Sequence, residues 1–154
     1  MLDACVVGFV SERAAWQCHG SVTYPFRLRY RTIEFGDVDI HIRTLRDTQE
    51  FRELDDEEDD FGISPASWAL SGVLWNSGEA LARLMFDYDI AGRRVLEVGC
   101  GIGLASLVLQ HRHVDITATD RHPEAAAFLA ANAALNYDDE VAFTRTDWAD
   151  EESG

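Results

Sequence analysis

The chain has 154 residues, of which 47% are hydrophobic, so it is long enough to form one soluble domain with a buried core. Its formal net charge is −15, and all 13 basic residues are arginine. A chain this acidic repels a phosphate backbone, and the lack of lysine excludes Schiff-base chemistry and a Walker-type phosphate lysine.

Two further features of the sequence indicate where in the cell the protein is located. No apolar run approaches the roughly 20 residues of a membrane helix, and the short apolar run at 4–10 has no basic residue ahead of it. The cysteines, Cys5, Cys18 and Cys100, are scattered and lack a C-x-x-C spacing, which argues against a disulfide framework. We therefore expect a cytoplasmic protein that binds neither nucleic acid nor membranes.

The first half of the chain predicts a β-hairpin followed by an acidic segment. Apolar residues alternate with polar ones at 26–31 and 38–43, on either side of a Gly-Asp turn. Seven of the eight residues from Glu53 to Asp60 are acidic, which favours a solvated linker; the alternative is an acidic lure for a basic substrate. The predicted divisions are an N-terminal segment (1–52), a linker (53–63) and a folded domain (64–154).

The second half predicts alternating helices and strands. One helix is expected to begin at 64–65, and a second to run from 77 to 88 with an apolar stripe of Leu81, Leu84 and Met85. The expected elements that follow are strands at 94–98, 115–120 and 141–145, and helices at 104–110 and 123–136. Alternation of this kind predicts a parallel sheet with helical crossovers.

A glycine-rich turn joins the first of these strands to the next helix. Gly99, Gly101 and Gly103 permit a tight turn and let a ligand lie directly on the backbone. Leu104 occupies the position of the third glycine in a dinucleotide fingerprint. Glu97 precedes the turn, where a carboxylate disfavours a pyrophosphate but suits a cation. The pattern therefore indicates S-adenosylmethionine, a cationic methyl donor, over a dinucleotide.

Acidic residues also end the two strands that follow. Asp120 lies 21 residues after Gly99, where its oxygens can accept from the two ribose hydroxyls; the alternative is a helix N-cap. Asp147 follows the third strand and can accept from an adenine amino group, while the neighbouring Trp148 can pack on the ring. For this pair the alternative is an ordinary surface turn.

These motifs resemble those of the class I, seven-strand methyltransferases that use S-adenosylmethionine. Residues 95–103 are similar to the first motif and 118–120 to the second. The W-x-S run at 75–77 resembles the segment before the first motif in the protein-lysine methyltransferase, or methyltransferase-16, group. The likeness extends over about 64–148 and implies an α/β fold, the first half of a Rossmann-like parallel sheet with flanking helices, here with an added N-terminal β-hairpin.

The resemblance implies an enzyme that N-methylates a protein lysine or another amine by direct displacement. The implied cofactor-binding residues are Trp75, Glu97, Gly99, Cys100, Gly101, Gly103, Asp120, Arg121, Asp147 and Trp148. Among them Glu97, Gly99 and Gly101 line the methionyl and ribose end, and Asp120 holds the ribose. Trp75 packs near the cofactor, or else is an ordinary core aromatic. No catalytic base and no metal site is assigned.

The sequence departs from the family in its length. Family members continue with a fourth strand and three more, whereas this sequence stops at Gly154, so we interpret it as a fragment or a truncated open reading frame. The first strand, normally central, is then expected to be an unpaired edge. We predict weak stability, association into homodimers, or compensation by the N-terminal hairpin.

Three other functions stay open on the sequence. A binding module would retain the methyl donor or its demethylated product without chemistry. A nucleotide-dependent oxidoreductase is favoured by glycine richness alone. A metal enzyme is suggested by His111 and His113, with His122 further on, although no further ligand is evident. The identity of the methyl acceptor does not follow from these residues.

Overall fold

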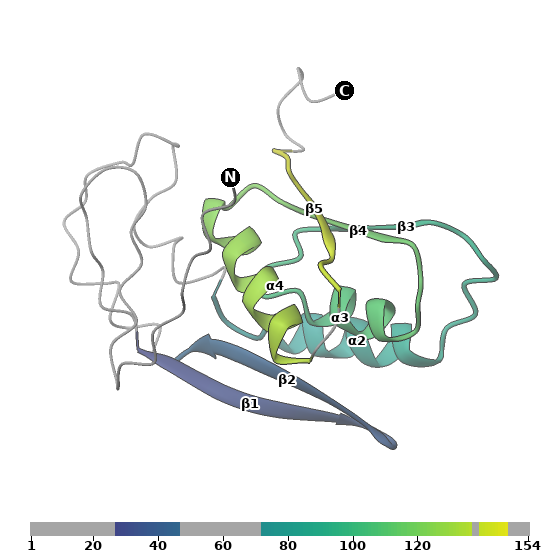
Figure 1. The fold of residues 1–154 in the computed structure, drawn as a ribbon, viewed down its shortest axis with the longest axis horizontal. Helices are drawn as coiled ribbons and strands as arrows, with labels where there is room; N and C mark the ends of the chain where they lie inside the picture. Colours follow the sequence, from purple (N-terminus) through teal and green to yellow (C-terminus); the bar gives the residue numbers. More distant parts are fainter. Residues whose placement is uncertain (1–26, 47–71, 137–138, 148–154) are drawn as a thin grey trace, which may run out of the picture.

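The computed structural model of the protein describes residues 27–46, 72–136 and 139–147. Within them lie an antiparallel hairpin, a three-stranded parallel sheet and three helices (Figure 1). The predicted acidic linker, the helix expected at 64–65 and Trp148 fall outside the described residues. None of the helices in the described segments is both long and apolar enough to cross a membrane.

The parallel sheet has the strand order β3-β4-β5. Its strands are β3 (Val95–Val98), β4 (Ile116–Asp120) and β5 (Ala142–Arg145). β4 is the central strand, and its residues Ile116, Ala118 and Thr119 are buried. All three strands run in the same direction, so their carboxyl ends meet at one edge, which is where ligands bind in open α/β sheets. The predicted α/β architecture is confirmed.

Two helices connect these strands. α3 (Leu104–His111) joins β3 to β4, and α4 (Pro123–Leu135) joins β4 to β5. α3 is apolar on nearly all sides because it packs against α2 (Asn76–Asp87), β4 and β2 (Val38–Leu45). α4 begins at Pro123, whose missing N–H is not needed in the first turn, and the ring of His122 caps it by accepting from the backbone N–H of Glu124 at 3.2 Å.

The predicted second helix is present as α2 (Asn76–Asp87), but its apolar stripe was assigned incorrectly. Met85 is partly buried against the core. Leu81 and Leu84, in contrast, are 40% and 57% exposed. The buried face of the helix is centred instead on Ala82, which is fully buried.

The neighbours of α2 explain this difference. α2 packs against α3 on one side and contacts the hairpin on another, where the ring of Phe86 lies 5.5 Å from the ring of Phe35. The small side chain of Ala82 permits close helix packing at this point. Helical spacing alone could not predict which apolar side of α2 would face these partners.

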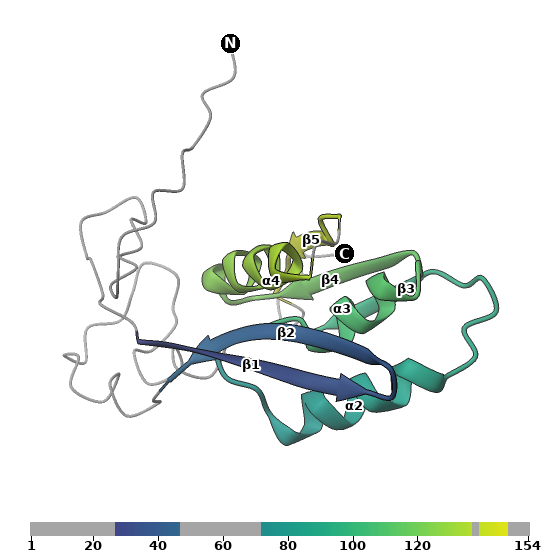
Figure 2. The ribbon, with the colours of Figure 1, turned by 60° about the horizontal axis from the view of Figure 1, so that its bottom comes forward.

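The hairpin consists of β1 (Leu28–Phe35) and β2 (Val38–Leu45). Gly36 has a φ of 65°, a conformation that suits a two-residue hairpin turn and favours glycine. Ile33 pairs with Ile40, and both are buried, so one face of the hairpin packs on the core. The predicted hairpin is confirmed, and Figure 2 shows β2 on the side nearer to α4.

The outer edge of β2 is closed by hydrogen bonds from outside the hairpin. Alternate residues of a strand at a sheet edge direct their N–H groups away from the partner strand and need other acceptors. Three such groups in succession find them: His41 N–H donates to Asn136 Oδ1 (2.7 Å), Arg43 N–H to Asn132 Oδ1 (2.8 Å) and Leu45 N–H to Gly72 O (2.7 Å). The contacts of β2 with α4 and α3 place these two helices between the hairpin and the parallel sheet (Figure 1).

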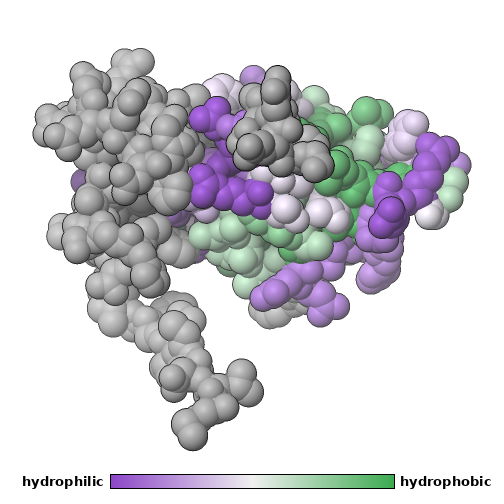
Figure 3. All heavy atoms as spheres, turned by 90° about the horizontal axis from the view of Figure 1, so that it is seen from above, coloured by the Kyte–Doolittle hydropathy of each residue, from purple (hydrophilic) through white to green (hydrophobic). Residues whose placement is uncertain are grey.

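β3 pairs with β4 and with no other strand in the described part of the chain. Apolar side chains gather over this end of the sheet in the view from above (Figure 3). The large apolar residues exposed along β3 and α2 are Trp75, Leu81, Leu84, Tyr88, Leu96 and Val98. The hairpin packs on α4 and α3 and does not pair with β3, so it does not supply the compensation expected for this edge. Weak stability and association stay predictions.

Candidate functional site

The turn after β3 is built from glycines in the left-handed region. The φ angles of Gly99, Gly101 and Gly103 are 69°, 54° and 82°. A residue with a Cβ is strained in this conformation, so the backbone path itself requires the alternating glycines. Gly103 is the N-cap of α3, and its N–H donates to the carbonyl of Cys100 at 2.9 Å.

The first and last glycines of this turn have different surroundings. A Cβ at Gly103 would lie 2.2 Å from Cδ1 of Leu129 in α4, whereas nothing lies within 4 Å of a Cβ at Gly99. Gly103 therefore permits close packing of the turn on α4, and it does not line the pocket described below. Its expected contact with a cofactor stays a prediction, as does that of Gly99.

Glu97 places a carboxylate at the start of this turn. It lies in β3 and is partly buried, and its carboxylate accepts a hydrogen bond from the hydroxyl of Ser106 in α3. Burial raises the pKa of Glu97; the hydrogen bonds from Ser106 oppose this rise, and the nearby charge of Asp120 adds to it. A cation beside Glu97 would offset the cost of burying its negative charge.

Asp120 ends β4, next to β3, and connects two loops. Its Oδ2 accepts from the N–H of Gly101 at 2.8 Å, and its Oδ1 accepts from the N–H of His122 at 2.8 Å. The N-cap of α4 is His122, so the interpretation of Asp120 as a helix N-cap is wrong. Each carboxylate oxygen can accept more than one hydrogen bond, so both keep capacity for ribose hydroxyls.

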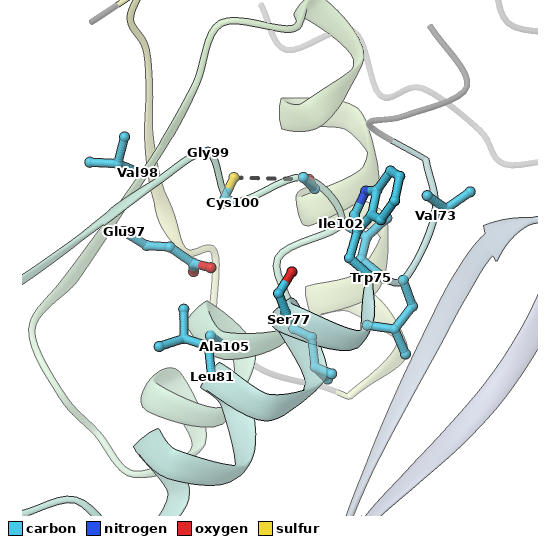
Figure 4. A pocket seen from close by; sticks show the side chains of 14 residues that line it. Val73, Trp75, Ser77, Leu81, Glu97, Val98, Gly99, Cys100, Ile102 and Ala105 are labelled. Atoms are coloured by element: carbon cyan, nitrogen blue, oxygen red, sulfur yellow. Dashed lines mark hydrogen bonds between the residues drawn. The ribbon is translucent and has the colours of Figure 1, made fainter. Parts of the chain in front are cut away.

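Glu97 and the glycine turn face an open pocket of about 250 Å³ next to α2 (Figure 4). Trp75, Ser77 and Ile102 also line it. Figure 4 shows Glu97 and Ser77 on two sides of this space, with the indole of Trp75 beside Ile102. Trp75 is the N-cap of α2 and 52% exposed, so the alternative of an ordinary core aromatic is wrong.

Cys100 lines the same pocket but is buried. Burial raises the pKa of the Cys100 thiol, and the charges of Glu97 and Asp120 raise it further. The thiol is therefore neutral and unsuited to act as a nucleophile. In this structure its contribution to the pocket is that of a small apolar side chain.

Arg121 and Asp147 lie at the same carboxyl edge of the sheet but do not line the pocket. The Nε of Arg121 is 3.9 Å from Oδ2 of Asp147. The carbonyl of Arg121 accepts from Nε of Arg145 at 2.9 Å, which connects the ends of β4 and β5. Their expected contacts with the cofactor stay predictions, and Trp148 falls outside the described residues.

Two residues near the pocket were not identified from the sequence. Ser106 is fully buried and fixes the carboxylate of Glu97. Its signal was a lone polar residue among apolar ones in the helix of residues 104–109. Asn132 is also fully buried and donates to the carbonyl of Ile102 within the turn. Neither partner could be inferred from spacing along the chain.

The histidines do not support the metal-enzyme alternative. His111 ends α3, His113 has a φ of 56° in the turn that follows, and His122 caps α4. Among the residues that the structure describes, no three His, Cys, Asp or Glu side chains are grouped to hold a metal ion.

A parallel α/β sheet with a carboxylate before a glycine turn, and another at the end of the neighbouring strand, is consistent with part of a Rossmann-like methyltransferase fold. The family model of the lysine methyltransferases matches residues 63–153, and the chain belongs to this family. It is also similar to the protein N-lysine methyltransferase METTL21A of Danio rerio, with 36% identity over 69 residues. That alignment covers 44% of this chain and 31% of the relative, so the chain matches less than a third of that protein.

Proposed function

We propose that this chain carries the S-adenosylmethionine-binding part of a protein N-lysine methyltransferase. The observation that carries the proposal is the partly buried carboxylate of Glu97, which lines the pocket directly before the glycine turn. A carboxylate here disfavours a phosphate ligand and favours a cationic one. Membership of the lysine methyltransferase family supports a methyl donor as that cation.

Each residue of the site has a proposed role in holding the donor. Glu97 and the glycine turn would hold its methionyl and ribose end, and Asp120 would accept from the ribose hydroxyls. Trp75 would pack beside it, and Asp147 would border the adenine. When bound, the donor supplies an electrophilic methyl group on its sulfonium. The protein contributes position and exclusion of water, which account for much of the rate in direct displacement.

The proposed methyl acceptor is a lysine side chain of another protein. The similar Danio rerio protein is a protein N-lysine methyltransferase by name, which supports this class of acceptor. The net charge of −15 also supports it, because an acidic surface attracts basic protein segments. We further propose that the protein acts in the cytoplasm.

A second candidate is a module that binds the donor or its demethylated product without turnover. A lysine nucleophile must first lose a proton. In the described part of the pocket lining, the titratable side chains are Glu97 and Cys100. Glu97 is engaged with Ser106, and the thiol of Cys100 has a raised pKa, so neither is placed as a base for the acceptor. This observation favours binding without chemistry.

Calorimetry followed by a transfer assay tests both candidates. Under the proposal, S-adenosylmethionine, S-adenosylhomocysteine and sinefungin release heat on binding, NADH does not, and Glu97→Gln binds more weakly. Transfer of labelled methyl groups to a lysine-rich protein then supports the enzyme, and binding without transfer supports the module. Heat with NADH alone would overturn both.

A further inference from the structure

Asn132 in α4 contacts the hairpin and the glycine turn at the same time. Its side chain is fully buried, at 0% exposure. Its Oδ1 accepts from the N–H of Arg43 at 2.8 Å, and its Nδ2 donates to the carbonyl of Ile102 at 2.9 Å. Ile102 lies between two glycines of the turn and lines the pocket. One amide group therefore connects β2 to the wall of the candidate site.

The carbonyl of Ile102 depends on this contact because of its position in the chain. It lies before α3, whose ladder begins with the carbonyl of Gly103 accepting from Leu107 N–H at 2.9 Å. A buried carbonyl without a donor is costly, and a turn rich in glycine has many other conformations available to it. The Nδ2 of Asn132 satisfies this carbonyl and selects one conformation of the turn.

Only a side-chain amide fits the two neighbours of Asn132. The N–H of Arg43 needs an acceptor, and the carbonyl of Ile102 needs a donor. Asparagine presents one of each on a short and rigid group. An ionised aspartate could accept from Arg43 but would direct a negative charge at the Ile102 carbonyl. An alanine would leave both groups unsatisfied.

Asn136, one helical turn later, provides a matched comparison within the chain. It pairs with β2 in the same way: its Oδ1 accepts from His41 N–H at 2.7 Å, and its Nδ2 donates to His41 O at 2.8 Å. Its Nδ2 also donates to Asn132 O at 2.7 Å. Both asparagines therefore hold the hairpin, whereas Asn132 alone also holds the glycine turn.

We propose that Asn132 is a positioning residue for the candidate site, which fixes the turn of residues 101–103 in its ligand-binding shape and couples it to the hairpin. The ligand in this inference rests on the proposed function, but the effect on the turn does not. Loss of Asn132 should therefore loosen the turn even in the ligand-free protein. Loss of Asn136 should loosen only the hairpin.

The experiment compares Asn132→Ala with Asn136→Ala in the full chain. Affinity for S-adenosylhomocysteine is measured by calorimetry, and amide hydrogen exchange of residues 101–103 is measured without ligand. We expect Asn132→Ala to bind about tenfold more weakly and to exchange faster in the turn, because a buried carbonyl loses its donor. Asn136→Ala should lower thermal stability while affinity and turn exchange stay near those of the wild type.

Asn132→Ser is the second variant, to be used if Asn132→Ala does not fold. The serine hydroxyl is shorter than the asparagine amide, so it leaves at least one of the two partners unsatisfied. Equal effects of the Asn132 and Asn136 variants on the turn, or no effect of the Asn132 variants, would overturn the inference. If the wild type binds no ligand, the proposed function fails, and the exchange data still decide the role of Asn132.

Discussion

The side chain of Asp120 accepts a hydrogen bond of 2.8 Å from the backbone N–H of Gly101, so the end of β4 holds the turn that follows β3. The charge of Asp120 also contributes to the raised pKa of Glu97. Two carboxylates from neighbouring strands thus act on one turn, one by hydrogen bonding to its backbone and the other by lining its pocket. Such a pair favours a cationic ligand.

The first prediction concerns Asp120→Asn. The amide of asparagine has one acceptor oxygen, so it cannot serve Gly101 and His122 through two oxygens as aspartate does. We expect a loss of about 1–3 kcal/mol in the free energy of unfolding, measured by urea denaturation. Binding of S-adenosylhomocysteine should weaken in parallel. The control is Asp139→Asn at an exposed position, and equal stability of the two variants would contradict the prediction.

The second prediction concerns the stability of Glu97→Gln as a function of pH. Burial raises the pKa of Glu97 in the folded protein, so the folded state favours the protonated form. This stabilising contribution is complete below the pKa of the unfolded chain and is lost as the pH rises through the pKa of the folded protein. Glutamine has no such dependence.

Glu97→Gln should therefore be more stable than the wild type above the folded-state pKa of Glu97, and this advantage should shrink at acid pH. Melting temperatures across a pH series test this. The same variant should bind the cationic donor about tenfold more weakly, because it lacks the negative charge. A variant that is less stable at every pH would show that the charge of Glu97 supports the fold, contrary to our interpretation.

The third prediction concerns Ser106, whose hydrogen bonds hold down the pKa of Glu97. In Ser106→Ala the pKa of Glu97 should rise further, because burial is then less opposed. As the pH is lowered, donor affinity should therefore begin to fall at a higher pH in this variant than in the wild type. Calorimetry across a pH series measures this. Ser77→Ala, at an exposed residue lining the same pocket, should leave the pH profile in place. Coinciding profiles for Ser106→Ala and the wild type would contradict the role of Ser106.

Local features of the sequence were sufficient to predict the elements that position the site. The period of two at 26–31 and 38–43 and the Gly36 turn predicted the hairpin. Left-handed conformations at Gly99, Gly101 and Gly103 are likewise a property of each residue and its neighbours. The adjacency of Glu97 and Asp120 follows from strand order, which the alternation of helices and strands makes predictable.

Contacts between distant segments could not be predicted in this way. Asn132 and Arg43 are 89 residues apart in the sequence, and only the packing of β2 on α4 brings them together. The same limit applies to α2, where spacing predicted a burial for Leu84 that its neighbours do not provide. An apolar stripe shows that a helix has a buried side but does not identify the partner.

The fourth prediction separates two glycines of the turn. Gly103→Ala places a Cβ against Leu129 in addition to the strain of a positive φ, whereas Gly99→Ala meets the strain alone. We expect a loss of about 2–4 kcal/mol for Gly103→Ala and about 1 kcal/mol for Gly99→Ala in urea unfolding. Gly103→Ala should lower the free energy of unfolding by less in a Leu129→Ala background than in the wild type, because the overlap with Leu129 is removed. Equal losses at the two glycines would show that close packing on α4 is not important.

The last prediction concerns the apolar surface beside β3. Leu96 is 51% exposed on a strand that has a partner on one side only among the described residues, and it does not line the pocket. Exposed edges with apolar side chains promote pairing between chains, and a charge on the edge opposes it. We therefore expect sedimentation velocity to show concentration-dependent association of the wild type that Leu96→Arg abolishes. Tyr30→Arg, at a 65% exposed position on the hairpin, should associate like the wild type. A wild type that sediments as a monomer at every concentration would show that this edge is satisfied in another way.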